Sequence, residues 1–490
     1  MTRRMRLTHA TRRWLPLAAL LLATPADADK QAPPPPAAPR PFALPQHQDV
    51  GLDNGTRITT VAYGSVAKAA ITLMIRGGKS EETAQQTWLA DLMGTSLGEG
   101  TQSRPATKLA EAAAAMGGDL EVNVEADQIT IGLEVLAEFA PQAIALVADV
   151  ARNPAFPPAD VDRVKSDLVR RLAIARTQPG QLAREQFRAA LYPDHPYGRT
   201  LPAEPLLQGY TVDQVRAFYA AHVGAARSHL YIVGKFDAAA VGKAARDALA
   251  DWARGPEPQP VPVAPPAPPA VRVVDRPGAV QSTLIVGLSV ITPKSDDYIA
   301  LLVTDALLGG SFGSRITSNI REQKGYTYSP FSTVMALEGN AAWSEQADVT
   351  TNVTGASLTE IFKEVARLRS EPPAADELRR IQSYLAGVFV LRNSTRFGIT
   401  RQLNFLDKHQ LGDDYLRDFA QRVWAVKPAD VQRIASTYLD PKKMAIVVVG
   451  DRKQVDAQLK PWTGGGTTKP GAAKPGAARG KSSPGGRKQP

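Results

Sequence analysis

The sequence predicts an α+β fold in which two homologous halves, each a layer of strands covered by helices, follow each other along the chain. Strand-like and helix-like segments occur in both parts and are partly segregated. A stretch with eight prolines, residues 255–270, divides the body into parts of similar length and is typical of a semi-rigid spacer. The same order of elements recurs on either side of that stretch.

The recurrence is clearest between residues 211–236 and 427–452. Each segment reads as a helix, a short polar turn, a buried strand ending in Val-Gly and a further helix. Aligned without a gap, Val215 meets Val431, Leu230 meets Ile446, Val233 meets Val449 and Gly234 meets Gly450. The strand and helix at 70–97 also parallel those at 282–308. The pattern therefore indicates duplication of one α+β unit.

The individual elements follow from the same patterns. We expect strands at 58–63, 69–75, 120–124 and 128–134, and helices at 83–97, 106–116, 141–152, 159–176, 180–191 and 298–308. The resulting domains are a signal peptide at 1–28, a Pro-rich lead-in at 29–48, an N-terminal half at 49–254, the linker at 255–270, a C-terminal half at 271–462 and a disordered basic tail at 463–490.

The N-terminus has the features of a secretory signal. Five arginines lie before Trp14, an apolar run follows, and Ala26-Asp27-Ala28 fits a small-residue cleavage site. The apolar run is too short to span a bilayer, and no second candidate span follows it. The chain has no cysteine, which excludes disulfides, a lipoprotein anchor and thiolate metal sites. We therefore expect a periplasmic or secreted protein, cleaved near Ala28.

The formal net charge of +10 lies at the two ends of the chain. The signal and the tail carry the excess, and the body between them is neutral. The folded part therefore does not present a basic nucleic-acid surface, and we expect no nucleic-acid partner. The tail is rich in Gly, Pro, Ala and Lys and reads as a solubilising segment, with contact to an anionic surface as the alternative.

A glycine-rich turn at 308–313 precedes a predicted helix at 314–324. Gly325 is placed to end that helix, and a predicted strand then begins at Tyr326, with Tyr328 on the same face. Arg321 lies in the last turns of the helix. Its guanidinium group and the Tyr328 phenol can point into one space, where both could donate to a substrate carbonyl or a developing oxyanion.

This stretch resembles the C-terminal-half signature of the insulinase/pitrilysin-type metallopeptidases. Residues 194–198, Asp-His-Pro-Tyr-Gly, also resemble a recurrent segment of that family's first half. The resemblance implies two α/β-layer halves that form half of a clamshell chamber. It assigns Arg321 and Tyr328 to the family's substrate-positioning pair, and Gly309 and Gly310 to substrate binding.

Active members of that family carry H-x-x-E-H on a helix of the first half, where two histidines bind zinc and the glutamate activates water. Counted back from the Gly-Thr pair at 100–101, the motif falls on residues 91–95. Asp91 and Thr95 replace the histidines, and Gly94 replaces the general base. A later glutamate ligand falls near Arg170 and Arg171. The resemblance therefore implies no metal in this chain and zinc in a partner subunit.

No other site has comparable support. None of the five histidines after the signal peptide forms an i, i+3 or i, i+4 pair. Asp91 with Asp127 or Glu121 could form a hard-cation site, but no spacing favours it over ordinary surface or cap residues. Residues 309–313 fit G-x-S-x-G, yet the preceding segment reads as a helix, whereas a nucleophile elbow follows a strand.

Together these features predict the zinc-less subunit of a periplasmic insulinase-like peptidase complex, inactive alone. A zinc-bearing family member would be its heterodimer partner, and peptides would be the substrates, with Arg321 and Tyr328 reaching the partner's site. One alternative is a non-enzymatic scaffold or peptide-binding protein of the same fold. Another is an independent hydrolase with a different site.

Overall fold

The computed structural model describes residues 43–265 and 267–463. The predicted signal peptide, the lead-in up to residue 42 and the predicted tail beyond Thr463 lie outside the described residues. Within the described ranges, no helix is long and apolar enough to cross a membrane.

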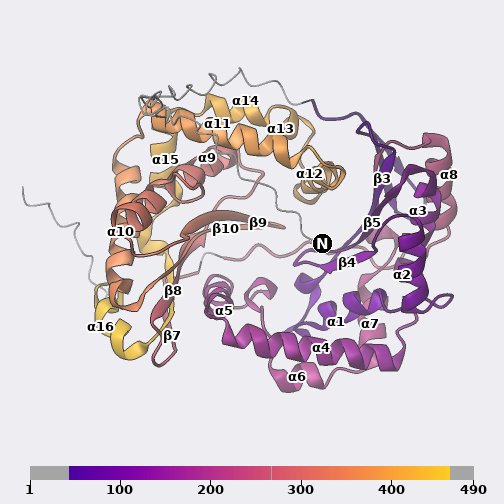
Figure 1. The fold of residues 1–490 in the computed structure, drawn as a ribbon, viewed down its shortest axis with the longest axis horizontal. Coiled ribbons are helices and arrows are strands. Elements are labelled where there is room, and N and C mark those ends of the chain that lie inside the picture. Colours follow the sequence, from indigo (N-terminus) through magenta and orange to yellow (C-terminus); the bar gives the residue numbers. More distant parts are fainter. Residues whose placement is uncertain (1–42, 266, 464–490) are drawn as a thin grey trace, which may run out of the picture. The chain divides into compact units, whose positions relative to one another are not determined.

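The first half contains a six-stranded sheet (Figure 1). Its strands, in spatial order, are β1 (His47–Gly51), β2 (Arg57–Ala62), β6 (Ser228–Gly234), β3 (Lys68–Arg76), β5 (Gln128–Leu136) and β4 (Glu121–Val124). β2 runs parallel to β6, and all other neighbours are antiparallel.

The second half repeats this topology in a five-stranded sheet. Its strands, in spatial order, are β7 (Val271–Asp275), β11 (Ala445–Gly450), β8 (Gln281–Ser289), β10 (Asn340–Thr350) and β9 (Phe331–Leu337). β7 runs parallel to β11, and the remaining pairs are antiparallel. Without the additional edge strand β1, the two sheets have the same strand order and the same directions. The predicted α+β fold with duplicated halves is confirmed.

Helices account for most of the remaining chain. The first half has α1 (Leu89–Leu97), α2 (Ala106–Ala115), α3 (Ala140–Arg152), α4 (Pro158–Thr177), α5 (Pro179–Leu191), α6 (Glu204–Gln208), α7 (Val212–His222) and α8 (Ala238–Leu249). The second half has α9 (Tyr298–Leu308), a π-helix (Thr317–Gln323), α10 (Thr354–Ser370), α11 (Ala375–Arg392), α12 (Arg396–His409), α13 (Asp414–Arg417), α14 (Phe419–Ala425), α15 (Pro428–Tyr438) and α16 (Arg452–Thr463).

One predicted helix, 83–97, begins later than expected. Residues 79–86 form two short 3₁₀ turns, and Trp88 takes a φ of 70°, so α1 starts only at Leu89. The Glu82 carboxylate then accepts a hydrogen bond from the backbone N–H of Ala90 at 2.8 Å. Because this cap comes from eight residues upstream rather than from the residue before the helix, the local sequence does not mark the true start.

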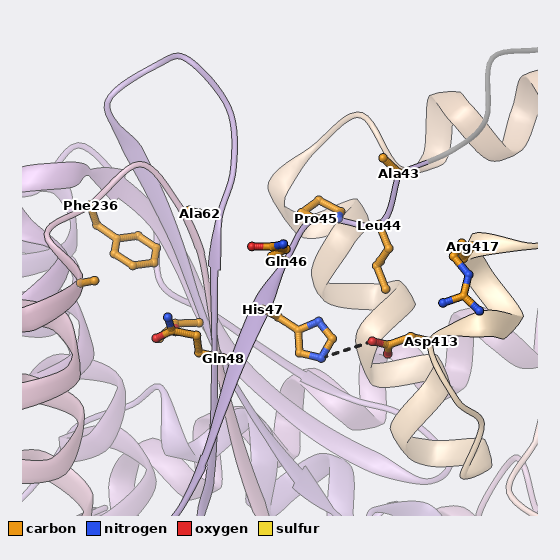
Figure 2. Close-up of a pocket in the computed structure, with 12 residues that line it drawn as sticks. Ala43, Leu44, Pro45, Gln46, His47, Gln48, Ala62, Phe236, Asp413 and Arg417 are labelled. Atoms are coloured by element: carbon orange, nitrogen blue, oxygen red, sulfur yellow. Dashed lines mark ion pairs between the residues drawn. The ribbon is translucent and has the colours of Figure 1, made fainter.

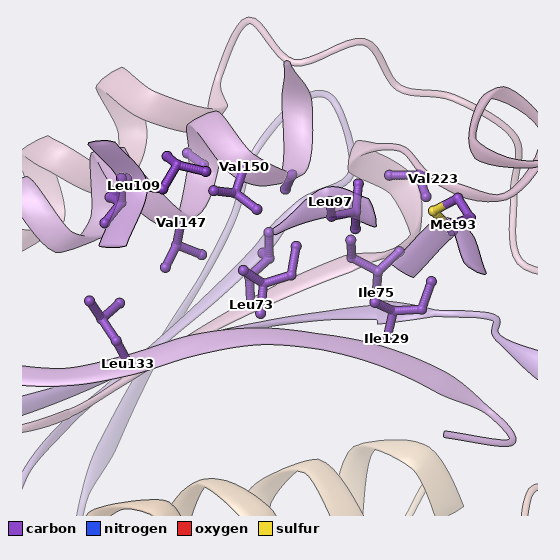
Figure 3. Packing of buried hydrophobic residues seen from close by; sticks show 14 of the residues in the cluster. Leu73, Ile75, Met93, Leu97, Leu109, Ile129, Leu133, Val147, Val150 and Val223 are labelled. Atoms are coloured by element: carbon purple, nitrogen blue, oxygen red, sulfur yellow. The ribbon is translucent and has the colours of Figure 1, made fainter. Parts of the chain in front are cut away.

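The core of the first half lies between its sheet and the helices on one side of it. Figure 3 shows Leu73, Ile75 and Leu133 on the strands, with Leu97 and Val147 on the helices that cover them. All five side chains are buried. β3 is buried at every position from Ala69 to Ile75, so this strand is covered on both faces.

The other face of each sheet is covered by a helix from the opposite half. α5 packs on β8 and β11, where Phe187 belongs to the same buried cluster as Ile285 and Val447. α12 packs on β3 and β6, where Ile399 joins Val233. The two halves therefore exchange one covering helix each.

Polar contacts also join the halves and the linker. Asp127, in the β4–β5 turn, accepts hydrogen bonds from the Tyr197 hydroxyl and from the backbone N–H of Glu338 at 3.0 Å. In the linker, the carbonyl of Pro262 lies 2.8 Å from His195 Nε2. Two members of the Asp-His-Pro-Tyr-Gly segment thus have direct structural roles.

Candidate functional site

The segment aligned with the zinc motif lies on α1, in the core of the first half. Asp91 is buried there, and its Oδ1 atom lies 3.0 Å from the Lys79 ammonium group. Its Oδ2 atom is buried without a hydrogen-bond partner among the described residues. A buried carboxylate is tolerated when a positive charge lies beside it, and here a lysine supplies that charge. An ion pair within the chain therefore occupies the position of the first metal ligand.

The position of the general base is closed by a neighbouring strand. A Cβ atom on Gly94 would overlap the Cγ2 methyl group of Val124 on β4. A glutamate side chain at this position would therefore have to displace the Val124 side chain. Thr95, at the second histidine position, is half-buried and offers only a hydroxyl oxygen in place of an imidazole.

Glu82 is a buried acid beside this segment that the sequence did not single out. Burial, reinforced by the charge of Asp91, raises its pKa to about 8 despite its hydrogen bond from Ala90. The side chain is therefore largely protonated at neutral pH. Its spacing from Asp91 matches no metal-binding motif, so nothing in the sequence separates it from an exposed glutamate.

The predicted later ligand position lies on α4, which packs against α1. Arg170 and Arg171 are both exposed, because the buried face of α4 is formed by Val164, Leu168 and Leu172. In the described ranges no group of three or more His, Cys, Asp or Glu side chains is arranged to hold a metal ion. The alternative cation site is not assembled either, since Asp127 is bonded across the halves as described above and Glu121 is exposed.

The glycine-rich turn follows α9 directly, so Ser311 is not preceded by the strand that a nucleophile elbow requires. Gly309 is buried, and a Cβ atom there would overlap Glu345 Oε2. A Cβ atom on Gly310 would lie 2.6 Å from Asp305 Oδ2. Both positions therefore require glycine, because a larger residue would clash with a buried carboxyl group. Their contact with substrate stays a prediction.

The two acids beneath the turn differ in their surroundings. Asp305 accepts hydrogen bonds from Ser332 Oγ at 2.5 Å and from Trp343 Nε1 at 2.8 Å, and burial raises its pKa to about 6. Glu345 is 1% exposed, and neither of its oxygens has a hydrogen-bond partner among the described residues. Burial, with the nearby Asp305 charge, raises the pKa of Glu345 well above its usual range. Burial of this unpaired carboxyl group therefore favours its protonated form.

Arg321 and Tyr328 lie together, and Phe312 from the glycine-rich turn joins them. The Arg321 Cζ atom lies 4.3 Å from the ring centroid of Phe312 and 5.1 Å from that of Tyr328. Phe312 is 73% exposed and Tyr328 is 80% exposed, whereas the Arg321 side chain is 23% exposed. We call these three residues the arginine–aromatic cluster. The expected proximity of Arg321 and Tyr328 is present, while their role stays a prediction.

The backbone around Arg321 and Tyr328 differs from the predicted helix and strand. Residues Thr317–Gln323 form a π-helix in place of an α-helix, and Gly325 ends it with a φ of 65°. The strand predicted from Tyr326 is wrong, because only Thr327 forms a β-bridge there. The Tyr326 N–H donates back to the carbonyl of Ile320 at 2.8 Å, which turns the chain and prevents an extended conformation. π-helical turns of this kind are frequent at functional sites.

A Thr-His-Asp arrangement elsewhere lines a cavity of about 260 Å³ between β2, β6 and α12. His229 Nε2 lies 2.7 Å from Thr59 Oγ1, and its Nδ1 lies 3.4 Å from Asp407 Oδ2. Arg57, which can only donate, lies 2.8 Å from Nδ1. Nδ1 is then the acceptor, Nε2–H donates to Thr59, and Thr59 donates to Asp49 at 2.5 Å. Since the ring cannot take a proton from Thr59, this arrangement does not support an independent hydrolase.

A wider cavity of about 800 Å³ lies beside β1 and α13 (Figure 2). Within it, His47 Nε2 faces Asp413 Oδ2 at 3.7 Å. None of its lining residues belongs to α1, to the glycine-rich turn or to the arginine–aromatic cluster. This cavity is therefore separate from both predicted sites.

A duplicated α+β fold with an inverted zinc motif that has lost its ligands defines a metallopeptidase homologue without the zinc-binding residues. The family model "Insulinase (Peptidase family M16)" matches residues 57–204, and the model "Peptidase M16 inactive domain" matches residues 209–385. The chain belongs to peptidase family M16, the insulinase family.

Individual relatives agree with this assignment. An uncharacterized zinc protease of Streptomyces coelicolor is 24% identical over 418 residues, which cover 83% of this chain and 90% of the relative. A peptidase M16 inactive domain from Pseudomonas fluorescens has a TM-score of 0.77 at 22% identity, covering 83% of this chain and 98% of that structure. A protease from Helicobacter pylori has a TM-score of 0.78 at 17% identity, covering 83% and 100%. The likeness to these two structures is one of fold.

Proposed function

We propose that this protein is the non-zinc-binding subunit of an insulinase-like metallopeptidase complex. It holds no metal and positions a peptide for the zinc site of a partner subunit of the same family. The observation that carries the proposal is the arginine–aromatic cluster: an oriented guanidinium group flanked by exposed rings, in a chain without the family's zinc motif.

The chemistry of the cluster suits a positioning role. The rings of Phe312 and Tyr328 restrict the Arg321 guanidinium group before a ligand binds. Binding therefore costs less side-chain entropy than it would for an unrestrained arginine. The guanidinium N–H groups and the Tyr328 hydroxyl are donors suited to peptide carbonyls and to a developing oxyanion. Zinc in the partner would activate the attacking water, whereas this chain would hold the peptide in the reactive orientation.

The proposed complex is periplasmic or secreted, after cleavage near Ala28. In it this chain forms a heterodimer with the zinc-bearing member, and each contributes half of a closed chamber. The membership of the second half in the inactive-domain family supports a partner role.

The test is peptide hydrolysis by the mature chain alone and mixed with the zinc-bearing family member encoded by the same organism, with and without a chelator. We expect no turnover by this chain alone and chelator-sensitive turnover that rises in the mixture. Arg321→Ala and Tyr328→Phe in this chain should each lower kcat/KM of the mixture by roughly tenfold or more, because orientation is lost.

Arg422→Ala is the matched control. Arg422 makes a contact of the same kind elsewhere, with its Cζ atom 5.8 Å from the Tyr415 ring centroid, and its loss should leave turnover unchanged. Turnover by this chain alone, or full turnover with both Arg321→Ala and Tyr328→Phe, would contradict the proposal. A mixture that assembles without any gain in turnover would favour the scaffold alternative.

A further inference from the structure

Phe312 occupies the exposed tip of the glycine-rich turn, yet its position is closely determined. The turn is seated on buried groups, because Gly309 packs against Glu345 and Gly310 packs against Asp305. From this base Phe312 contacts the Arg321 guanidinium with its ring face, at the shorter of the two ring distances in the cluster. An exposed aromatic residue held over a cation is available for binding without the cost of ordering it.

The contacts of Arg321 leave one edge of the guanidinium group open. Its Nε atom lies 3.2 Å from Glu322 Oε1, so the Nε edge already has an anionic partner. The Nη1 and Nη2 atoms have no hydrogen-bond partner in the part of the chain that the structure describes. The nearby cation Lys324 is paired with Glu360 at 3.4 Å and does not compete for the same ligand. The open edge therefore presents two parallel donors to solvent.

We propose that the arginine–aromatic cluster is a binding site for a peptide carboxylate, and that Phe312 is the residue that determines this specificity. The inference rests on the proposed function and names the ligand of that same site. Two parallel N–H donors match the two oxygens of a carboxylate, whereas a peptide carbonyl uses only one of them. The exposed rings of Phe312 and Tyr328 provide an apolar surface for the side chain beside the carboxylate.

A peptide carboxylate has two sources, the C-terminus and an acidic side chain, and the test separates them. Binding of fluorescently labelled peptides to the mature chain alone is measured by anisotropy. The first pair of peptides ends in Leu, as the free acid or as the amide. The second pair is amidated and carries Glu or Gln next to an internal Leu.

We expect one free carboxylate to strengthen binding by about tenfold over its neutral counterpart, the difference between charge-assisted and neutral hydrogen bonds. Arg321→Lys should remove this preference, because an ammonium group lacks the planar pair of donors. Phe312→Leu should weaken binding about three- to fivefold, and Phe312→Tyr should restore it, because the contribution comes from the aromatic face. Arg422→Ala should bind as the wild type does.

The outcomes separate this inference from the proposed function. Equal binding of the acidic and neutral peptides in both pairs, or no measurable binding of any peptide, overturns the inference. In that case Arg321→Ala still tests the proposed function through turnover of the mixture. A carboxylate preference that depends on Phe312 and Arg321, found together with a mixture that gains no turnover, supports the inference and contradicts the proposed function.

Discussion

The two halves place different residues at equivalent positions of their sheets. In the first sheet Leu73 pairs with Leu230 and with Ile131, and in the second sheet Val286 pairs with Ile446 and with Glu345. Since Leu230 and Ile446 are equivalent, so are Ile131 and Glu345. Their exposures are 0% and 1%, respectively.

This difference shows that burial alone does not determine the residue at this position. Isoleucine brings no polar group into the core. A buried glutamate without a hydrogen-bond partner destabilises the fold, and its packing contacts do not compensate for the lost hydration of the carboxyl group. The glutamate lies under Gly309, next to the predicted site of the second half. The first half has an apolar residue there, and Lys79 and Val124 pack against the segment that aligns with the family's zinc motif. The halves thus share a fold but differ in where each tolerates polar groups.

The largest expected effect comes from restoring the general base in the first half. Gly94→Glu should lower the free energy of unfolding by roughly 4 kcal/mol or more, because the side chain overlaps Val124 and buries a charge. Urea unfolding measures the loss. Val124→Ala in the same chain should recover part of it, and exposed Arg171→Glu should change stability little. A Gly94→Glu variant as stable as the wild type would show that β4 does not close the site.

A second pair of variants compares the buried acids of the two halves. Burial raises the pKa of Glu82 to about 8 in the folded protein and also raises the pKa of Glu345. The folded state therefore favours the protonated form of each acid. This contribution to stability is complete only below the unfolded pKa near 4.5 and is lost as the pH rises. Wild-type stability should therefore fall as pH rises above 4.5, up to about pH 8 for Glu82. Glu82→Gln should remove part of this fall, by roughly 3 kcal/mol at pH 8, and Glu345→Gln should also make the fall smaller.

Urea unfolding between pH 4 and pH 8 measures this difference. Glu121→Gln, at an exposed position on β4, is the control for the substitution itself. The free energy of unfolding could also depend on pH in the same way in the wild type and in both glutamine variants. That result would mean that the two acids ionise in the folded protein as easily as in the unfolded one.

The smallest effect concerns the helix that the second half contributes to the first sheet. Burial opposes ionisation of Asp407, but the neighbouring His229 and the ion pair with the Arg57 guanidinium group lower its pKa to about 2. Its contribution is therefore present above the unfolded pKa of 3.8 and is lost as pH falls toward 2. Asp407→Asn should cost about 1–2 kcal/mol at pH 7 and less at pH 3. A cost that is the same at both values would assign the effect to packing instead of charge.

The sequence predicted those features that repeat along the chain. Apolar runs located β3 and β5, and the recurring Val-Gly strand ends revealed the duplication, because burial imposes the same pattern in both halves. The proximity of Arg321 and Tyr328 was also expected, from a helix followed by a glycine. These features depend on residues close together in the chain.

The remaining features depend on contacts between distant residues. Glu82 caps α1 across two 3₁₀ turns, Phe312 reaches Arg321 from the preceding turn, and Glu345 is buried although its strand neighbours give no sign of it. The π-helix and the turn after it replace an expected α-helix and strand because Tyr326 bonds back to Ile320. No local pattern indicates which sheet a helix such as α5 will cover, since its apolar face would suit either one.

The exchange of α5 and α12 makes the two halves interdependent in folding. A fragment ending in the linker would lack α12 and leave the apolar side chains of β3 and β6 in water, and the complementary fragment would lack α5. We therefore expect that neither half folds as a free-standing module, although the two halves have equivalent sheets. Cutting the linker should instead yield two pieces that recover their structure only when they are mixed.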